Sequence, residues 1–135
     1  CRIARSANAV VELVPEVGDF VADGDPLFRV RGSALMSTTA LRECVAIGTE
    51  RTLDQDPRFA FRILVDIATR ALSPGLNDPT TAVLALDQIH HLLLAVGKRS
   101  LGDGEVRDET GTVRVCFETP NWEDYVVLAT AEIRQ

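Results

Sequence analysis

The stretch RALSPGLNDPTTA, residues 70–82, lies between two strongly apolar segments and determines how they are joined. Pro74 disfavours helical dihedral angles at Ser73, and it has no amide hydrogen to donate. A helix over residues 57–72 must therefore end just before this point. Gly75 then allows the chain to reverse its direction.

A second helix is predicted to begin at the end of this stretch. Asp78 is placed as its N-cap, because the carboxylate can accept hydrogen bonds from the amides of Thr80 and Thr81. Pro79 suits the first helical position, where no amide partner is missed. The same Asp-Pro pair occurs at residues 56–57, which indicates that this chain uses the pair to start helices.

Residues 57–72 and 79–97 are thus predicted to form an αα-hairpin, and each helix carries an apolar stripe at helical spacing. The stripe comprises Phe59, Ala60, Ile63, Leu64, Ile67, Ala68 and Ala71 on the first helix, and Ala82, Val83, Leu86, Ile89, Leu93 and Val96 on the second. Both helices are apolar over a broad arc and need more cover than one small sheet provides. We therefore expect the chain to self-associate.

The whole chain is predicted to adopt an α+β fold as a single domain, residues 1–135. A small β-sheet, made of a hairpin at residues 9–31 and a strand near 112–118, packs with the αα-hairpin (57–72, 79–97) and with further helices near 34–46 and 122–134. Ser33 and Asn121 are the expected caps of the two further helices. Residues 98–111 are predicted to be a loop.

Within the first hairpin, VGDFVADGDPLFRV resembles the hammerhead hairpin of lipoyl and biotinyl carrier domains. The resemblance implies tight turns at the glycines. It does not imply a carrier function, because those domains need a lysine at a hairpin tip, and the single lysine here is Lys98.

Composition excludes several classes of protein. The net charge is −6, and no basic run is longer than Lys98-Arg99, so neither a nucleic acid nor an anionic lipid surface is an expected partner. Cys1, Cys44 and Cys116 are odd in number and widely spaced, which indicates neither a disulfide framework nor a zinc site and fits a reducing compartment.

The most apolar segment, residues 81–96, is interrupted by polar side chains. Asp87, Gln88, His90 and His91 lie near its centre, so we expect no membrane-spanning helix here. The adjacent histidines point in different directions on a helix and do not form a metal site. His90 is expected to be partly buried among apolar neighbours.

The loop at residues 73–81 has two interpretations. Its amides and hydroxyls could bind a small anionic ligand at the positive end of the second helix, beside Arg51 or Arg70. The candidate ligand-binding residues are Arg51, Arg70, Ser73, Asn77, Asp78, Thr80 and Thr81. A purely structural cap and turn is favoured over this site, because Asp78 already supplies an anion to the helix terminus.

The residues give no positive evidence for catalysis. No nucleophile elbow, phosphate-binding loop, dinucleotide fingerprint or zinc-protease motif occurs, so we assign no catalytic residue, metal or cofactor. An enzyme of the hydrolase class is kept as the alternative. It would use the polar residues around Ser73, Asn77, Asp78 and Arg51.

Residues 48–89, with RT..QD..F, LVDIA.RALSPG.NDPTTA and LD, resemble the signature segment of a bacterial family of predicted integral membrane proteins of unknown function. In that family several spanning helices precede a soluble C-terminal region. The resemblance implies that this chain, which starts at Cys1, is the soluble piece of a longer membrane-tethered protein. With an even number of spans and a cytoplasmic N-terminus, the piece would face the cytoplasm.

The sequence therefore predicts a regulatory, ligand-sensing or assembly domain of a bacterial membrane protein, with an enzyme as the alternative.

Overall fold

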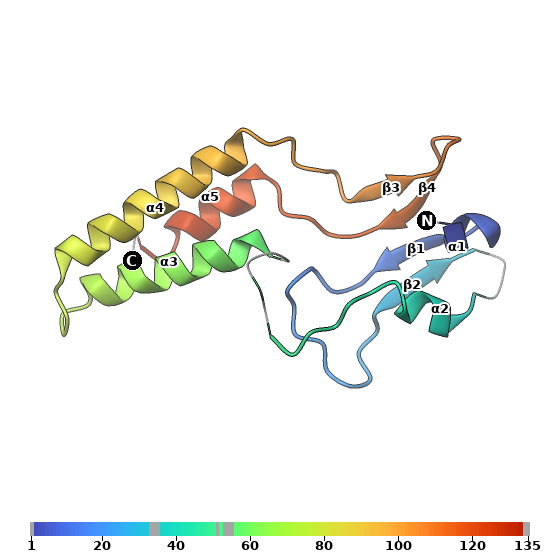
Figure 1. Ribbon diagram of the computed structural model, residues 1–135, viewed down its shortest axis with the longest axis horizontal. Coiled ribbons are helices and arrows are strands. Elements are labelled where there is room, and N and C mark those ends of the chain that lie inside the picture. The colour runs from blue at the N-terminus through green and yellow to red at the C-terminus, as the bar shows by residue number, and fades with distance from the viewer. Residues whose placement is uncertain (1, 33–35, 51, 53–55, 134–135) are drawn as a thin grey trace. The chain divides into compact units, whose positions relative to one another are not determined.

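The computed structural model describes residues 2–32, 36–50, 52 and 56–133, which fold as two compact units. The sheet unit takes in residues 1–50 and 102–119, and the helical unit takes in residues 51–101 and 120–135. Along the chain, the first part of the sheet unit is followed by two long helices of the helical unit. Two further strands of the sheet unit come next, and the last helix belongs to the helical unit (Figure 1). The prediction of a single domain stays a prediction.

The sheet unit contains four short strands in the order β2-β1-β4-β3. They are β1 (Val10–Leu13), β2 (Phe28–Arg31), β3 (Glu105–Arg107) and β4 (Val113–Cys116). Strand β1 runs antiparallel to β2 and parallel to β4, and β3 runs antiparallel to β4. The predicted hairpin at residues 9–31 and the predicted strand near 112–118 are confirmed.

A small core lies on this sheet. Ala4 of helix α1 (Arg2–Ser6) and Leu41 of helix α2 (Thr38–Arg42) are buried in one cluster with Val11 of β1. Phe28 and Met36 pack against that cluster and are half-buried. Helix α1 was not predicted, because five residues are too few to show helical periodicity.

A polar network supplements this core. The Arg114 Nε atom lies 2.7 Å from Asp108 Oδ2, and only 12% and 3% of the two side chains are exposed. Arg114 also donates to Asn8 Oδ1 at 3.0 Å, so the turn between β3 and β4 is tied to the junction of α1 and β1. Hydrogen bonds from the Thr110 hydroxyl and from Arg114 hold the pKa of the Asp108 carboxyl far below its ordinary value.

The prediction of a loop at residues 98–111 is wrong for residues 105–107, which form β3. The backbone closes the hairpin at both ends: Phe117 N donates to Gly104 O at 2.8 Å, and Asp108 N donates to Thr112 O at 2.9 Å. The three residues of β3 are exposed and too few to show an alternating pattern. This segment therefore forms a strand because it pairs with β4, and not because of its local sequence.

The helix predicted near 34–46 is shorter than expected. Ser37 caps α2, with Ala40 N donating to its hydroxyl at 3.3 Å, and the helix ends at Arg42. Cys44 therefore lies beyond the helix. The expected cap, Ser33, lies outside the described residues.

The helical unit consists of α3 (Pro57–Leu72), α4 (Pro79–Gly97) and α5 (Trp122–Thr130). The αα-hairpin has the predicted bounds, and α5 packs against both of its helices (Figure 1). Each helix starts on the predicted residue: Asp56 accepts from Arg58 N at 3.0 Å, Asp78 accepts from Thr81 N, and Asn121 forms a reciprocal capping box with Asp124. Helix α5 ends earlier than the predicted residue 134.

The core of this unit joins all three helices. It contains Phe61, Val65, Ile89, Tyr125 and Ala129, and the rings of Phe61 and Tyr125 lie 5.5 Å apart. The other buried apolar residues in the described part of this unit are alanines, namely Ala68, Ala71, Ala82 and Ala85. Small residues at these positions let the helices approach closely.

The predicted buried faces of α3 and α4 are partly wrong. Ile63 and Ile67 are each 40% exposed, while Phe61 and Val65, which the prediction omitted, are buried. On α4, Val83 is 55% exposed. Both helices carry apolar residues on more than one face, so periodicity alone does not identify which face the neighbouring helix covers.

Candidate functional site

The loop between α3 and α4 is held by hydrogen bonds within the chain. Ser73 N and Ser73 Oγ both donate to Arg70 O, at 3.1 and 2.7 Å. Ser73 O accepts from Leu76 N and Asn77 N, at 3.1 and 2.9 Å, and Asp78 N donates to Ala71 O at 2.8 Å. The end of α3 is therefore closed by the loop itself.

The chain reverses in a turn over residues 73–76, which contains Gly75 as predicted and which Leu76 N closes by donating to Ser73 O; Asn77 follows it in a left-handed conformation. Asn77 has a φ of +45°, in the left-handed region that asparagine tolerates better than most residues. Gly75 has no positive φ, and a Cβ atom at this position would meet nothing within 4 Å. The structure gives no reason why residue 75 must be glycine.

Both carboxylate oxygens of Asp78 are used at the start of α4. Thr81 N donates to Oδ1 at 3.1 Å, and Thr81 Oγ1 donates to Oδ2 at 2.5 Å. These bonds from Thr81, with a smaller contribution from the Thr80 amide, lower the pKa of the Asp78 carboxyl below its ordinary value. The helix terminus thus has its own anion.

The structure brings some of the predicted site residues together and leaves others apart. Ser73 and Asp78 are hydrogen-bonded within the turn, whereas the residues Arg70, Asn77 and Thr80 are exposed. Arg51 lies outside the described residues. The arrangement supports the cap-and-turn interpretation of this loop.

Other polar candidates are also dispersed. His90, predicted to be partly buried, is exposed, and its ring lies 6.0 Å from that of His91. Asp66 is exposed on α3. Among the described residues, no group of three or more His, Cys, Asp or Glu side chains could hold a metal ion.

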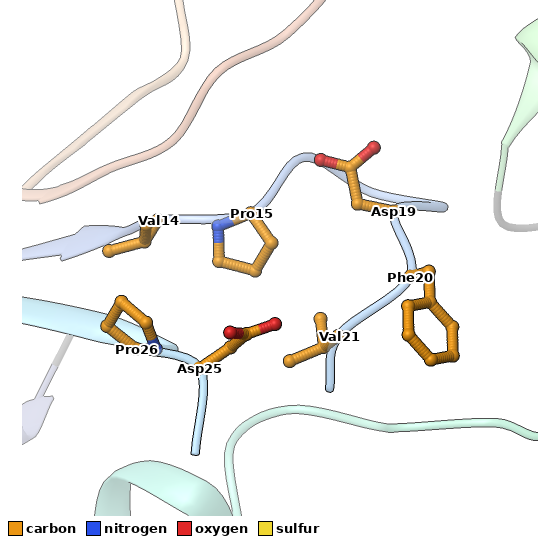
Figure 2. A pocket seen from close by; sticks show the side chains of 7 residues that line it. All are labelled: Val14, Pro15, Asp19, Phe20, Val21, Asp25 and Pro26. Atoms are coloured by element: carbon orange, nitrogen blue, oxygen red, sulfur yellow. The ribbon is translucent and has the colours of Figure 1, made fainter. Parts of the chain in front are cut away.

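A pocket that the sequence did not predict lies in the loop between β1 and β2 (Figure 2). Its volume is about 310 Å³, and its lining residues are Val14, Pro15, Asp19, Phe20, Val21, Asp25 and Pro26. Two equivalent turns build the loop, with φ values of +92° at Gly18 and +93° at Gly24, as the hammerhead resemblance implies.

Each turn is closed by an aspartate. Asp19 Oδ2 accepts from Glu16 N at 2.9 Å, and Asp25 Oδ2 accepts from Ala22 N at 2.8 Å. The two carboxylates are therefore already part of the loop's own structure. Phe20 is 91% exposed at the side of the pocket, where it adds apolar surface but little enclosure.

Large apolar side chains are exposed on α3 and α4. On α4, Val83 is 55% exposed, Leu84 60% and Leu94 47%. On α3, Ile63 and Ile67 form a similar exposed strip. The sequence indicated the breadth of these apolar arcs, but the packing of the three helices determines which side chains stay uncovered.

By length and composition, α4 could also cross a membrane, contrary to our expectation from its polar residues. The same properties suit a core helix, and its side chains Ala82, Ala85 and Ile89 are buried within the helical unit. Length and composition alone do not separate the two roles.

Comparison with known sequences assigns the chain to a family of predicted membrane proteins. The model of the family described as "Predicted membrane protein (DUF2254)" matches residues 1–135. The chain belongs to this family, in agreement with the predicted resemblance.

The chain is 37% identical over 141 residues to the uncharacterized protein Rv1290c of Mycobacterium tuberculosis and to the uncharacterized protein Mb1321c of Mycobacterium bovis. It is 39% identical over 140 residues to the uncharacterized protein MT1328 of another M. tuberculosis strain. Each match covers 98% of this chain but 27% of the relative, so the chain spans about a quarter of the length of these relatives. No solved structure matches the chain significantly.

Proposed function

We propose that this chain is a soluble, non-enzymatic assembly domain of a bacterial membrane protein, which joins subunits through its helical hairpin. The observation that carries the proposal is the exposure of large apolar side chains along α3 and α4. Of the residues in the apolar stretch of α4, only 17% are buried within the described structure. A surface of this kind is typical of an interface that a partner covers.

The packing of the helical unit explains why a partner is needed. Helix α5 is nine residues long, against 19 for α4, so it covers only part of the hairpin. Val83 and Leu94 remain about half exposed although the core of the unit is complete. Covering further apolar surface would stabilise an assembly by roughly 25 cal/mol per Å².

The loop between α3 and α4 also supports the assembly function, because its polar groups are already hydrogen-bonded within the chain. A ligand-sensing site needs donors and acceptors that are available to the ligand. Here the Ser73 hydroxyl and both Asp78 oxygens are used within the turn. We therefore assign the loop a structural role, which is to fix the angle between α3 and α4.

An enzymatic function has less support. Asp66 and His90 are exposed, and Asp78 serves as a cap. A catalytic constellation needs its groups positioned around a site that excludes water. These residues offer no such arrangement.

We also propose that the domain lies on the cytoplasmic side of the membrane. Its support is that Cys44 and Cys116 are free, and a reducing compartment keeps such thiols reduced. Protease treatment of spheroplasts that contain the full-length protein tests this placement. Protection of the domain from external protease is expected, and digestion from outside would contradict the placement.

Sedimentation velocity with two matched variants tests the assembly function. Val83→Glu places a charge among exposed apolar side chains, whereas Gln88→Glu adds the same charge at an exposed polar position of the same helix. We expect the wild-type chain and Gln88→Glu to self-associate and Val83→Glu to remain monomeric. Glutamate is a good helix former, so both variants should fold.

The ligand-sensing alternative predicts a different result. Inorganic phosphate would then raise the melting temperature, because a ligand that binds only the folded state stabilises it by mass action. Phosphate stabilisation that is lost in Thr81→Val, together with a monomeric wild-type chain, would overturn the assembly function.

A further inference from the structure

We infer that α4 pairs antiparallel with α4 of a second copy of this chain, across a two-fold axis. This inference rests on the proposed function and specifies its interface. Six exposed residues at helical spacing share one side of α4, and this side is called the α4 face. The α4 face consists of Thr80, Val83, Asp87, His90, Leu94 and Gly97.

The α4 face is complementary to itself in one register. In an antiparallel two-fold pairing, each residue on one side of the axis meets its counterpart on the other side. With the axis between Gln88 and Ile89, Val83 of each copy meets Leu94 of the other. The two apolar side chains, 55% and 47% exposed in the single chain, then cover one another.

The same register sets an acidic side chain against a basic one at the centre of the α4 face. Asp87 of one copy meets His90 of the other, and symmetry repeats the pair. A carboxylate opposite an imidazole can form a hydrogen bond, and the pair is charge-complementary when the histidine is protonated. Pairing the two helices in parallel would instead set Asp87 against Asp87, which is unfavourable.

The ends of the α4 face also fit this register. Thr80 meets the Gly97 end of the helix, where the Trp122 ring occupies the space beside the glycine, so Thr80 lies against the indole. A Cβ atom at Gly97 would lie 3.2 Å from the Trp122 ring, which places the indole beside this end of the α4 face. Trp122 is 46% exposed and provides apolar surface next to the pairing helices.

A second copy fits the α4 face better than lipid does. Asp87 and His90 lie at the middle of the face, where a bilayer would leave them without water or a partner. An aspartate at the centre of a membrane helix costs about 2.5–3.5 kcal/mol on insertion scales. The second copy supplies the partner for each of these groups.

Cysteine cross-linking tests this register on the whole chain. Cys1, Cys44 and Cys116 are first replaced by serine, and Val83→Cys and Leu94→Cys are then introduced into separate chains. A disulfide needs Cα atoms roughly 4.4–6.8 Å apart. Residues 83 of the two copies would be about 16 Å apart along the helices, so neither variant should cross-link with itself.

We expect a disulfide between the two variants only after they are mixed and oxidised. Gln88→Cys mixed with Leu94→Cys is the matched control, because residue 88 lies outside the α4 face, and it should give no disulfide. Disulfides within the Val83→Cys preparation would indicate parallel pairing and overturn the inference. Equal cross-linking in the control would also overturn it, because the disulfides would then come from random collisions.

Sedimentation of the same samples separates this inference from the proposed function. Dimers that form no disulfide between the Val83→Cys and Leu94→Cys chains would overturn the α4 register but not the assembly function. Monomers at every concentration would overturn both.

Discussion

Replacing Gly104 by alanine tests whether the segment before β4 is an ordered hairpin or the loop that the sequence suggests. Gly104 has a φ of +74°, and a Cβ atom there would lie 2.1 Å from the carbonyl oxygen of Phe117. Real Cβ contacts essentially never fall below 3.0 Å, and the clashing atom belongs to the backbone. The β3–β4 hairpin must therefore deform to accept the methyl group.

The size of the effect follows from two costs. A left-handed conformation costs a residue with a Cβ atom roughly 1–2 kcal/mol. Moving the Phe117 carbonyl also strains the 2.8 Å hydrogen bond from Phe117 N to Gly104 O, whose loss costs about 1 kcal/mol. We expect a total destabilisation of about 3 kcal/mol, or about 10 °C in Tm for a chain of this size.

Two neighbouring glycines provide matched controls. Gly111 has a φ of +81° but nothing within 4 Å of its Cβ position, so Gly111→Ala should cost only about 1 kcal/mol. Gly102 has neither constraint, and Gly102→Ala should be neutral or stabilising by up to about 1 kcal/mol. Urea denaturation followed by circular dichroism measures all three. Equal and small effects would show that this segment is a loop and refute the reasoning.

Three further predictions concern the caps, the buried ion pair and the helical core. Asp78→Ala should lower Tm by roughly 3–8 °C through loss of the N-cap, whereas Thr80→Val should leave it nearly unchanged; calorimetry showing equal shifts would count against the cap. The folded-state pKa of Asp108 is depressed, so its stabilisation is present above the ordinary aspartate pKa of about 3.9 and is lost as pH falls. The Tm difference between wild type and Asp108→Asn should therefore shrink from pH 7 to pH 3, and a constant difference would contradict the network. Phe61→Ala should cost about 3–5 kcal/mol, and Ile67→Ala less than about 1.5 kcal/mol, in dilute solution. The reverse order in a denaturation series would mean that the buried face of α3 is assigned wrongly.

The helical hairpin could be predicted because local chemistry determines its ends. Asp56 and Asp78 cap their helices through adjacent amides, and Pro74 ends the first helix without help from distant residues. The buried faces could not be predicted in the same way. Ile67 and Val65 are both apolar, and only the position of the packed helices decides which of them is covered.

The sheet unit depends more on contacts between residues far apart in sequence. Strand β3 forms because β4 pairs with it, and Arg114 reaches Asn8 across more than a hundred residues. The run Asp108-Glu109-Thr110-Gly111 before an alternating segment is a turn signal that could have revealed this turn. Nothing in the local sequence reveals the partner at Asn8.

The cap and turn of the candidate loop could be predicted from its residues, whereas ligand binding by the loop stays a prediction. Asp78 and Thr81 meet as predicted, and Ser73 closes the end of α3. Whether such groups face a ligand or each other depends on rotamers and distances, which composition and spacing do not contain.

The molar mass of the unmodified chain, measured by static light scattering as concentration is raised, tests the assembly function most directly. The single chain has a mass of 14.7 kDa. One pair of helices makes a small interface, so the dimer should be weak and populated only in concentrated solution. The measured mass should rise toward twice the single-chain value, and a constant 14.7 kDa at the highest attainable concentration would contradict the account.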